Sequence, residues 1–216
     1  MMRIDVDGPV STGTEADTAA LRDHFREHDW AKLPGFIAPR LLAKLQSELR
    51  GAPFVTKNHP GIGKDLVAWG VSSDKLMFFM NDPRLLAWMH DVTGCGPFGN
   101  YLGRIYRMDA GTGHHDSWHS DLIDTRKVAL TANLSEEIYE GGTLLLRKKG
   151  RPETEIAIPN TGPGDAAIFR LEEGLEHWIS DLLPGPPKTA WAGWFREKPT
   201  FMEMVKQKVQ KKPEGA

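Results

Sequence analysis

The spacing of the apolar positions changes near the middle of the chain. In the first half, apolar residues recur at helical intervals among charged ones, which predicts amphipathic helices. The predicted helices run from Glu15 to about Trp30, from Leu41 to about Gly51 and from about Pro83 to Val92. The third has a proline at its start and Gly94 just beyond its end, the usual positions of these residues around a helix.

The segments around these helices are rich in turn-forming residues. Residues 52–70 contain several prolines and glycines and are expected to form a loop. Lys32 to Ile37 fits a short edge strand followed by a turn, because Pro34 has no amide hydrogen for a central ladder. Residues 1–14 are polar and rich in Gly, Ser and Thr, so we expect them to be mobile.

In the second half, apolar residues fall in short runs separated by Gly and Pro; some runs alternate with polar residues, and the one at Thr143–Arg147 is continuous. The predicted strands are Arg104–Tyr106, Lys127–Leu134, Thr143–Arg147, Glu153–Ile158, Asp165–Phe169, His177–Ile179 and Lys188–Phe195. Many short strands separated by turns predict a sandwich, barrel or jelly roll. We therefore expect a mainly β fold. It would be one domain at 15–209, with N-terminal helices buttressing a jelly-roll core (a cupin-like double-stranded β-helix) at about 98–197. A terminal helix is predicted at 201–209, and residues 210–216 are expected to be a flexible tail.

Composition limits the classes of function. The 216 residues are 40% hydrophobic and 26% charged, with a formal net charge of −2, so the chain has no overall positive field for nucleic acid. Cys95 is the only cysteine, which excludes an internal disulfide. No run approaches the about 18 apolar residues of a membrane span, and the N-terminus lacks the apolar segment of a secretory signal. We expect a soluble, cytoplasmic protein that binds neither nucleic acid nor membrane, with its oligomeric state left open.

Two histidines and an aspartate in the second half form a candidate metal site. His119-Ser120-Asp121 precedes a predicted strand, and His177 lies in a much later one. Two imidazoles and one carboxylate are the ligands of non-haem Fe(II) sites that keep coordination positions open. The upstream run His114-His115-Asp116 offers the same chemistry, so His114 or Asp116 remains an alternative ligand.

From about Tyr101 to Phe195, the chain resembles the prolyl 4-hydroxylase-like group of 2-oxoglutarate/Fe(II) dioxygenases. The matching pieces, in chain order, are Tyr106 followed by glycines, His119-Ser120-Asp121, Glu140-Gly141-Gly142-Thr143-Leu144, the run Pro163-Gly164-Asp165-Ala166-Ala167-Ile168-Phe169, His177 and Lys188. Each piece alone is weak, but the ordered set is fairly specific. The resemblance covers somewhat under half of the chain.

The resemblance implies that His119, Asp121 and His177 bind Fe(II). It also implies an enzyme that uses O₂ and 2-oxoglutarate and releases succinate and CO₂, with ascorbate as a candidate reductant. A halogenase branch of the same superfamily replaces the ligand aspartate by a small residue. The presence of Asp121 therefore favours hydroxylation, or a related oxidation such as desaturation.

The resemblance also implies how 2-oxoglutarate is held. Lys188 would pair with its distal carboxylate, with Thr189 as a supporting hydroxyl and Tyr106 reaching the same group. A dicarboxylate inside an apolar barrel needs such a cation, because an unpaired buried charge is costly. The proline-rich segment 184–187 makes the register of Lys188 unusual, so Arg196 remains an alternative anchor.

The substrate is not encoded in a recognisable motif. We expect a small molecule or a peptide or protein side chain, with His59, Trp69 and Trp118 as candidate contacts. Two rival interpretations remain open. One is a cupin-type metalloprotein that does not use 2-oxoglutarate and does not require Lys188; the other is a non-catalytic jelly-roll binding protein.

Overall fold

A seven-stranded antiparallel sheet forms the centre of the protein. The computed structural model describes residues 1–68, 72–160 and 162–210. The strand order is β3-β10-β7-β12-β6-β5-β4. In that order the strands are Trp30–Leu33, Ala166–Arg170, Arg126–Asn133, Lys188–Arg196, Asn100–Met108, Gly63–Ala68 and Phe54–His59.

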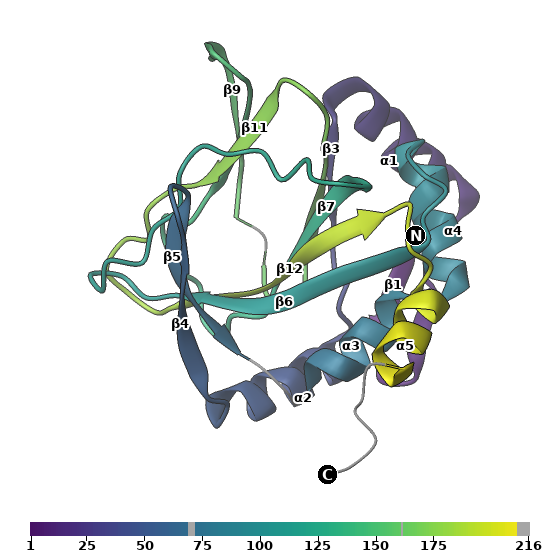
Figure 1. Ribbon diagram of the computed structural model, residues 1–216, viewed down its shortest axis with the longest axis horizontal. Coiled ribbons are helices and arrows are strands. Elements are labelled where there is room, and N and C mark those ends of the chain that lie inside the picture. Colours follow the sequence, from purple (N-terminus) through teal and green to yellow (C-terminus); the bar gives the residue numbers. More distant parts are fainter. Residues whose placement is uncertain (69–71, 161, 211–216) are drawn as a thin grey trace.

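A three-stranded sheet completes the β-structure around the site (Figure 1). Its order is β11-β8-β9, formed by Leu175–Ile179, Leu144–Lys148 and Arg151–Ile158. Ala129 and Phe169 of the large sheet share a buried cluster with Leu144 and Ile158 of the small one. The expectation of a mainly β jelly roll is therefore confirmed, and β3, β4 and β5 from the first half also join the large sheet.

Helices cover the opposite face of the large sheet (Figure 1). The helices are α1 (Glu15–His28), α2 (Pro39–Arg50), α3 (Ser72–Met80), α4 (Pro83–Thr93) and α5 (Phe201–Gln210). Phe25, Leu45 and Leu85 share one buried core with Tyr101 and Trp191 of the sheet. The helices expected at Glu15, Leu41 and Pro83 are thus confirmed as α1, α2 and α4. No helix in the described ranges is both long and apolar enough to cross a membrane.

The side chains of strand β12 (Lys188–Arg196) point alternately to the core beneath the helices and to the opposite face of the large sheet. Trp191 and Phe195 are fully buried in the core beneath the helices. Lys188, Ala190 and Trp194, on the other face, line a cavity between the two sheets. Because successive side chains of a strand point to opposite faces, this one segment joins the core to the site.

Within the expected loop at 52–70, the described residues 54–68 do not form a loop, and residues 69–70 lie outside the described ranges. Residues 54–68 form the antiparallel hairpin β4–β5, in which Lys57 pairs with Asp65 and His59 pairs with Gly63. Pro60 lies in the turn between the strands. The interpretation was wrong because strand β4 is largely exposed and carries polar residues on both faces, so no apolar alternation marks it.

The N-terminus also differs from the expected mobile segment. Strands β1 (Met2–Asp5) and β2 (Gly8–Ser11) form a hairpin. Ile4 is fully buried, and its backbone exchanges hydrogen bonds with Phe36 and Ala38 at 2.7 and 2.8 Å. A single buried isoleucine among polar neighbours carries too weak a pattern to predict this. Of the expected tail at 210–216, residue 210 ends α5 and the rest lies outside the described residues.

Replacing Ile4 by alanine tests whether this hairpin belongs to the folded core. We expect the free energy of unfolding to fall by about 2–5 kcal/mol, because the substitution leaves a cavity in a fully buried position. Val10→Ala, at a half-exposed position of the same hairpin, should change it by less than about 0.5 kcal/mol. Urea unfolding curves of the two variants give the comparison, and equal values would mean that the hairpin does not pack as described.

Candidate metal centre

The two histidines of the site lie opposite each other on neighbouring backbone segments. The amide of His119 donates to the carbonyl of His177 at 3.0 Å, and the reverse bond is 2.9 Å long. This isolated antiparallel bridge adds the segment around His119 to the edge of strand β11. Directly paired residues project their side chains on the same side, so the two imidazole centroids are only 4.2 Å apart.

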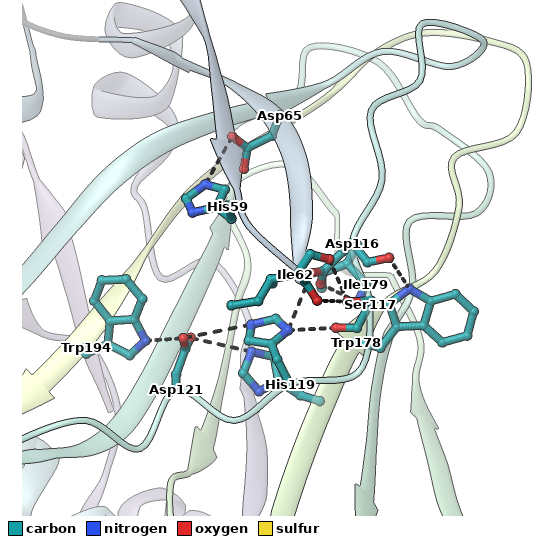
Figure 2. A network of polar contacts seen from close by, with 12 residues as sticks. His59, Ile62, Asp65, Asp116, Ser117, His119, Asp121, Trp178, Ile179 and Trp194 are labelled. Atoms are coloured by element: carbon teal, nitrogen blue, oxygen red, sulfur yellow. Dashed lines mark hydrogen bonds and ion pairs between the residues drawn. The ribbon is translucent and has the colours of Figure 1, made fainter.

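Asp121 completes a three-donor cluster. Its Oδ1 lies 3.8 Å from Nε2 of His119, and its Oδ2 lies 3.5 Å from Nε2 of His177. Ligand atoms of the three residues all lie within 4.8 Å of one another (Figure 2). Two neutral imidazoles and a carboxylate converging from one side fit Fe(II) and leave the opposite coordination positions to other ligands.

Two residues of the large sheet hold the Asp121 carboxylate. Trp194 donates its indole N–H to Oδ2 at 2.8 Å, and Arg126 lies 3.7 Å from Oδ1. The Arg126 guanidinium also stacks 3.7 Å from the centroid of the Trp194 ring. Burial by itself would raise the pKa of Asp121, but the hydrogen bond from His177 and the neighbouring imidazoles outweigh it and lower the pKa to about 2. The carboxylate is therefore ionised and ready to bind a cation.

Asp116 orients His119 from behind. Nδ1 of His119 lies 2.7 Å from the carbonyl oxygen of Ser117 and 3.4 Å from Oδ1 of Asp116. These acceptors fix the proton on Nδ1 and leave Nε2 as the metal-binding nitrogen. The other Asp116 oxygen accepts the amide of Ile179 at 2.8 Å (Figure 2). Asp116, considered above only as an alternative ligand, therefore faces away from the donor cluster, while Nδ1 of His114 accepts the amide of Asp109 at 3.1 Å.

Replacing Asp116 by alanine should weaken Fe(II) binding without abolishing it. The expected loss is about 10- to 100-fold in affinity, because carboxylates that orient metal-bound histidines contribute on that scale. Anaerobic equilibrium dialysis measures it directly, with Asp109→Ala as the control that removes a nearby carboxylate paired with Arg107 rather than one beside His119. A complete loss of binding would instead make Asp116 a ligand.

The donor cluster faces a cavity of about 440 Å³. Its inner wall is largely apolar and includes Leu144, Phe169, Ile179 and Ala190. Charged residues of the β4–β5 hairpin and of strand β6 line the remainder, including Lys57, Lys64, Asp65 and Arg104. The volume suits small ligands that bind beside the metal-binding residues.

Lys188 brings a buried amine into this cavity. Its Nζ donates to the carbonyl oxygen of Gly142 and lies 5.8 Å from the centroid of the Tyr139 ring. Burial lowers the pKa of Lys188 to about 8, although the charge of Asp116 opposes the shift. Gly142 has φ +57°, and a Cβ there would lie 3.0 Å from Cδ of Lys188. The glycine therefore allows both the turn and the close passage of the lysine stem.

The other residues expected to hold a dicarboxylate have different surroundings. Tyr106 lines the cavity, and burial raises its pKa to about 12, so its hydroxyl is protonated and can donate. Thr189 is buried on the opposite face of β12 and does not line the cavity, because the strand alternates. Arg196 lies at the far end of β12, 3.4 Å from Asp124, and is also outside the cavity lining.

The three residues expected to contact the substrate differ in their position relative to the cavity. His59 lines the cavity from strand β4. Trp118 packs against Trp178 with centroids 5.7 Å apart, and the Arg147 guanidinium covers it at 3.7 Å, so it belongs to a stack outside the cavity lining. Trp69 lies outside the described residues.

Comparisons with known proteins agree with this geometry at the level of the fold. The sequence matches no protein-family model and no curated protein. Among solved structures, a prolyl-4-hydroxylase from Pseudomonas putida is 20% identical, with a TM-score of 0.66 over 84% of this chain and 100% of that one. An oxidoreductase of the 2OG-Fe(II) oxygenase family from Burkholderia pseudomallei is 16% identical, with a TM-score of 0.63 over 93% and 98%. EvdO2 from Micromonospora carbonacea var. aurantiaca, solved with 2-oxoglutarate, is 18% identical, with a TM-score of 0.58 over 88% and 94%.

The chain has the fold of the 2-oxoglutarate/Fe(II) oxygenases. At these identities the likeness establishes the fold, and the chemistry of the site follows from the side chains that line the cavity.

Several residues of the site had no signal in the sequence. Asp65 and Lys64 lie in the hairpin that was expected to be a loop. Arg126 begins strand β7, one residue before the predicted start. Arg104 is the exception, because its spacing of two from Tyr106 within a strand places both side chains on the cavity face.

Proposed function

We propose that this protein is an Fe(II)- and 2-oxoglutarate-dependent dioxygenase that hydroxylates a small molecule or a peptide or protein side chain. The observation that supports this most strongly is one cavity with two kinds of polar group. Two histidines and an aspartate converge on one side, and a buried lysine amine enters from another strand. A structural zinc site would fill its coordination sphere with protein ligands, whereas this donor set leaves positions for exchangeable ligands.

Each side chain has a defined part in the proposal. His119, Asp121 and His177 hold the iron. Lys188 pairs with the distal carboxylate of 2-oxoglutarate, and Tyr106 donates its hydroxyl to the same dicarboxylate. When bound, iron, 2-oxoglutarate and O₂ supply the oxidation, with succinate and CO₂ as by-products and ascorbate as a candidate reductant.

The protein itself supplies orientation and a dry environment. The apolar wall around the donor cluster excludes water, which strengthens the pairing of Lys188 with an anion. The ligand position that is a small residue in the halogenase branch is an aspartate here, Asp121. Its carboxylate supports hydroxylation or a related oxidation over halide transfer. A cytoplasmic location, expected from the single cysteine, is part of the same proposal.

A stepwise anaerobic titration tests the proposal against its rivals. We expect a weak visible charge-transfer band that develops only when both Fe(II) and 2-oxoglutarate are present, followed by succinate release when O₂ is admitted. Iron binding without any response to 2-oxoglutarate would favour a cupin-type metalloprotein of another kind. A protein that binds no iron would be a non-catalytic jelly roll, and the proposal would be wrong.

A further inference from the structure

The β4–β5 hairpin forms a wall of the cavity that the proposed iron and 2-oxoglutarate sites do not use. Strand β5 pairs with β6 so that Val67 lies opposite Tyr106. Asp65 precedes Val67 by two residues, so its side chain lies on the same face of the sheet as Tyr106. Lys57 and His59 of β4 also line the cavity, and Figure 2 shows His59 and Asp65 on the hairpin near the metal-binding side chains.

Asp65 lines the cavity and has one buried carboxylate oxygen without a hydrogen bond. No donor within the described residues satisfies Oδ1, while the side chain as a whole keeps 19% of its surface exposed. Nε2 of His59 lies 3.5 Å from Oδ1, but burial lowers the pKa of His59 and so favours its uncharged form. Burial raises the pKa of Asp65 to about 7, and the charge of Asp116 adds to the shift while Lys57 opposes it. Leaving a buried carboxylate oxygen unpaired is costly, so such a group indicates a missing partner.

The other acidic groups of the cavity already have partners. Asp116 accepts the amide of Ile179 and lies beside His119, while Asp121 accepts the indole of Trp194. Asp65 is therefore the acid of the cavity, among the described residues, that remains for a ligand. A protonated amine would supply both a donor and a charge, and it would favour the ionised form of Asp65.

Basic side chains surround this acid on the same wall. Lys57 lies opposite Asp65 in the hairpin, and Lys64 and Arg104 also line the cavity. The charge of Arg104 acts on both His59 and Tyr106, so it lies on the side of the cavity where those residues meet. A ligand that carried only a positive charge would be repelled by these cations. A ligand with an acidic group as well as an amine matches both signs.

The strand next to Arg104 leaves room for such a ligand. Arg104 pairs with Ala192 of β12, and Ala192 in turn pairs with Thr131 of β7. These three residues line the cavity, and two of them are small. A compact ligand above this row would touch Arg104 on one side and the hairpin on the other.

We propose that Asp65 and Arg104 bind the primary substrate, and that this substrate is a free amino acid whose amine contacts Asp65 and whose carboxylate contacts Arg104. The inference rests on the proposed function, because it takes the remaining part of the cavity as the substrate site. His59 lies 3.5 Å from Asp65 and is close enough to Arg104 for its charge to act on the imidazole, so we expect His59 to limit the size of the side chain that fits.

The experiment is a calorimetric titration of the anaerobic protein loaded with Fe(II) and 2-oxoglutarate. The probes are the common free L-amino acids, each with its N-acetyl and carboxamide derivatives. We expect at least one amino acid to bind, and both derivatives of it to bind about 10-fold or more weakly. Charge-assisted hydrogen bonds contribute on this scale.

Two variants assign the two ends of the ligand. Asp65→Asn should weaken binding of the amino acid about 10- to 100-fold but leave the weak binding of its N-acetyl derivative unchanged. Arg104→Gln should also weaken binding of the amino acid about 10- to 100-fold. It should leave the weak binding of the carboxamide derivative unchanged, because that derivative has no carboxylate for Arg104 to bind. Asp23→Asn, on the exposed surface of α1, is the matched control and should bind like the wild type.

The results distinguish failure of the amino-acid site from failure of the proposed dioxygenase function. If the wild type binds Fe(II) and 2-oxoglutarate but no amino acid, or if Asp65→Asn weakens the amino acid and its N-acetyl derivative equally, the inference is wrong and the proposed function stands. If the wild type does not bind 2-oxoglutarate, the proposed function fails and the inference fails with it.

Discussion

Replacing His119 by alanine removes succinate formation from this protein. The remaining donors, Asp121 and His177, hold Fe(II) too weakly to keep it bound at micromolar concentrations, because one of only three protein ligands is gone. Equilibrium binding of Fe(II) and coupled detection of succinate measure the two losses separately. We expect both to fall below detection.

His114→Ala is the matched control for that experiment. His114 belongs to the neighbouring His-His-Asp run, and its ring nitrogen only accepts the amide of Asp109. Iron binding and turnover should stay within about twofold of the wild type, the scale expected for a peripheral hydrogen bond. Normal turnover by His119→Ala, or loss of iron binding by His114→Ala, would show that His114 rather than His119 is the iron ligand.

Replacing Lys188 by methionine should weaken 2-oxoglutarate binding by about 100-fold or more while leaving Fe(II) binding intact. Methionine keeps most of the volume but leaves the distal carboxylate buried without a cation, and breaking a buried ion pair costs about 3–5 kcal/mol. The dissociation constant of 2-oxoglutarate in the anaerobic iron complex gives the measurement. Lys127→Met, at a half-exposed lysine 3.8 Å from Glu197, serves as the control. A larger loss in Arg196→Met than in Lys188→Met would make Arg196 the anchor.

The same lysine predicts how 2-oxoglutarate binding depends on pH. Burial lowers the pKa of Lys188 to about 8, so the amine is charged at pH 7 and largely neutral at pH 9. Only the charged form attracts the dicarboxylate, so binding should weaken as the pH rises through 8. Lys188→Arg stays charged throughout and should bind with little change over this range. A wild type whose binding does not change between pH 7 and 9 would mean that the lysine does not contact the ligand.

The jelly roll was predictable because its central strands are apolar on at least one face. The alternation in 127–134 and the continuous apolar run in 166–169 both follow from burial between neighbouring strands, and these segments lie in β7 and β10. The β4–β5 hairpin was missed for the opposite reason. Its polar side chains face both the cavity and the solvent. The spacing of apolar residues therefore does not indicate a strand there.

Part of the candidate site could also be predicted from the sequence and part could not. His119, Asp121 and His177 could be selected in advance because metal chemistry restricts the residue types and the resemblance to the dioxygenase group implied which of them are ligands. The same resemblance implied Lys188 as the cation for a buried dicarboxylate. The pairing of the His119 segment with β11 could not be predicted, since it is an isolated bridge outside any regular strand. The role of Asp116 depends on that pairing, because strand β11 supplies the Ile179 amide that holds its carboxylate.

The bridge between His119 and His177 also bears on how the protein folds. It closes a loop that contains strands β7, β8, β9 and β10, so the contact between the two imidazoles depends on how both sheets are arranged. A metal ion shared by these histidines acts as a cross-link across that loop and stabilises the native state over any partly folded one, by mass action. Proteolytic resistance of the segment between the two histidines should therefore rise with iron concentration, which makes metal supply a determinant of the lifetime of the protein as well as of its activity.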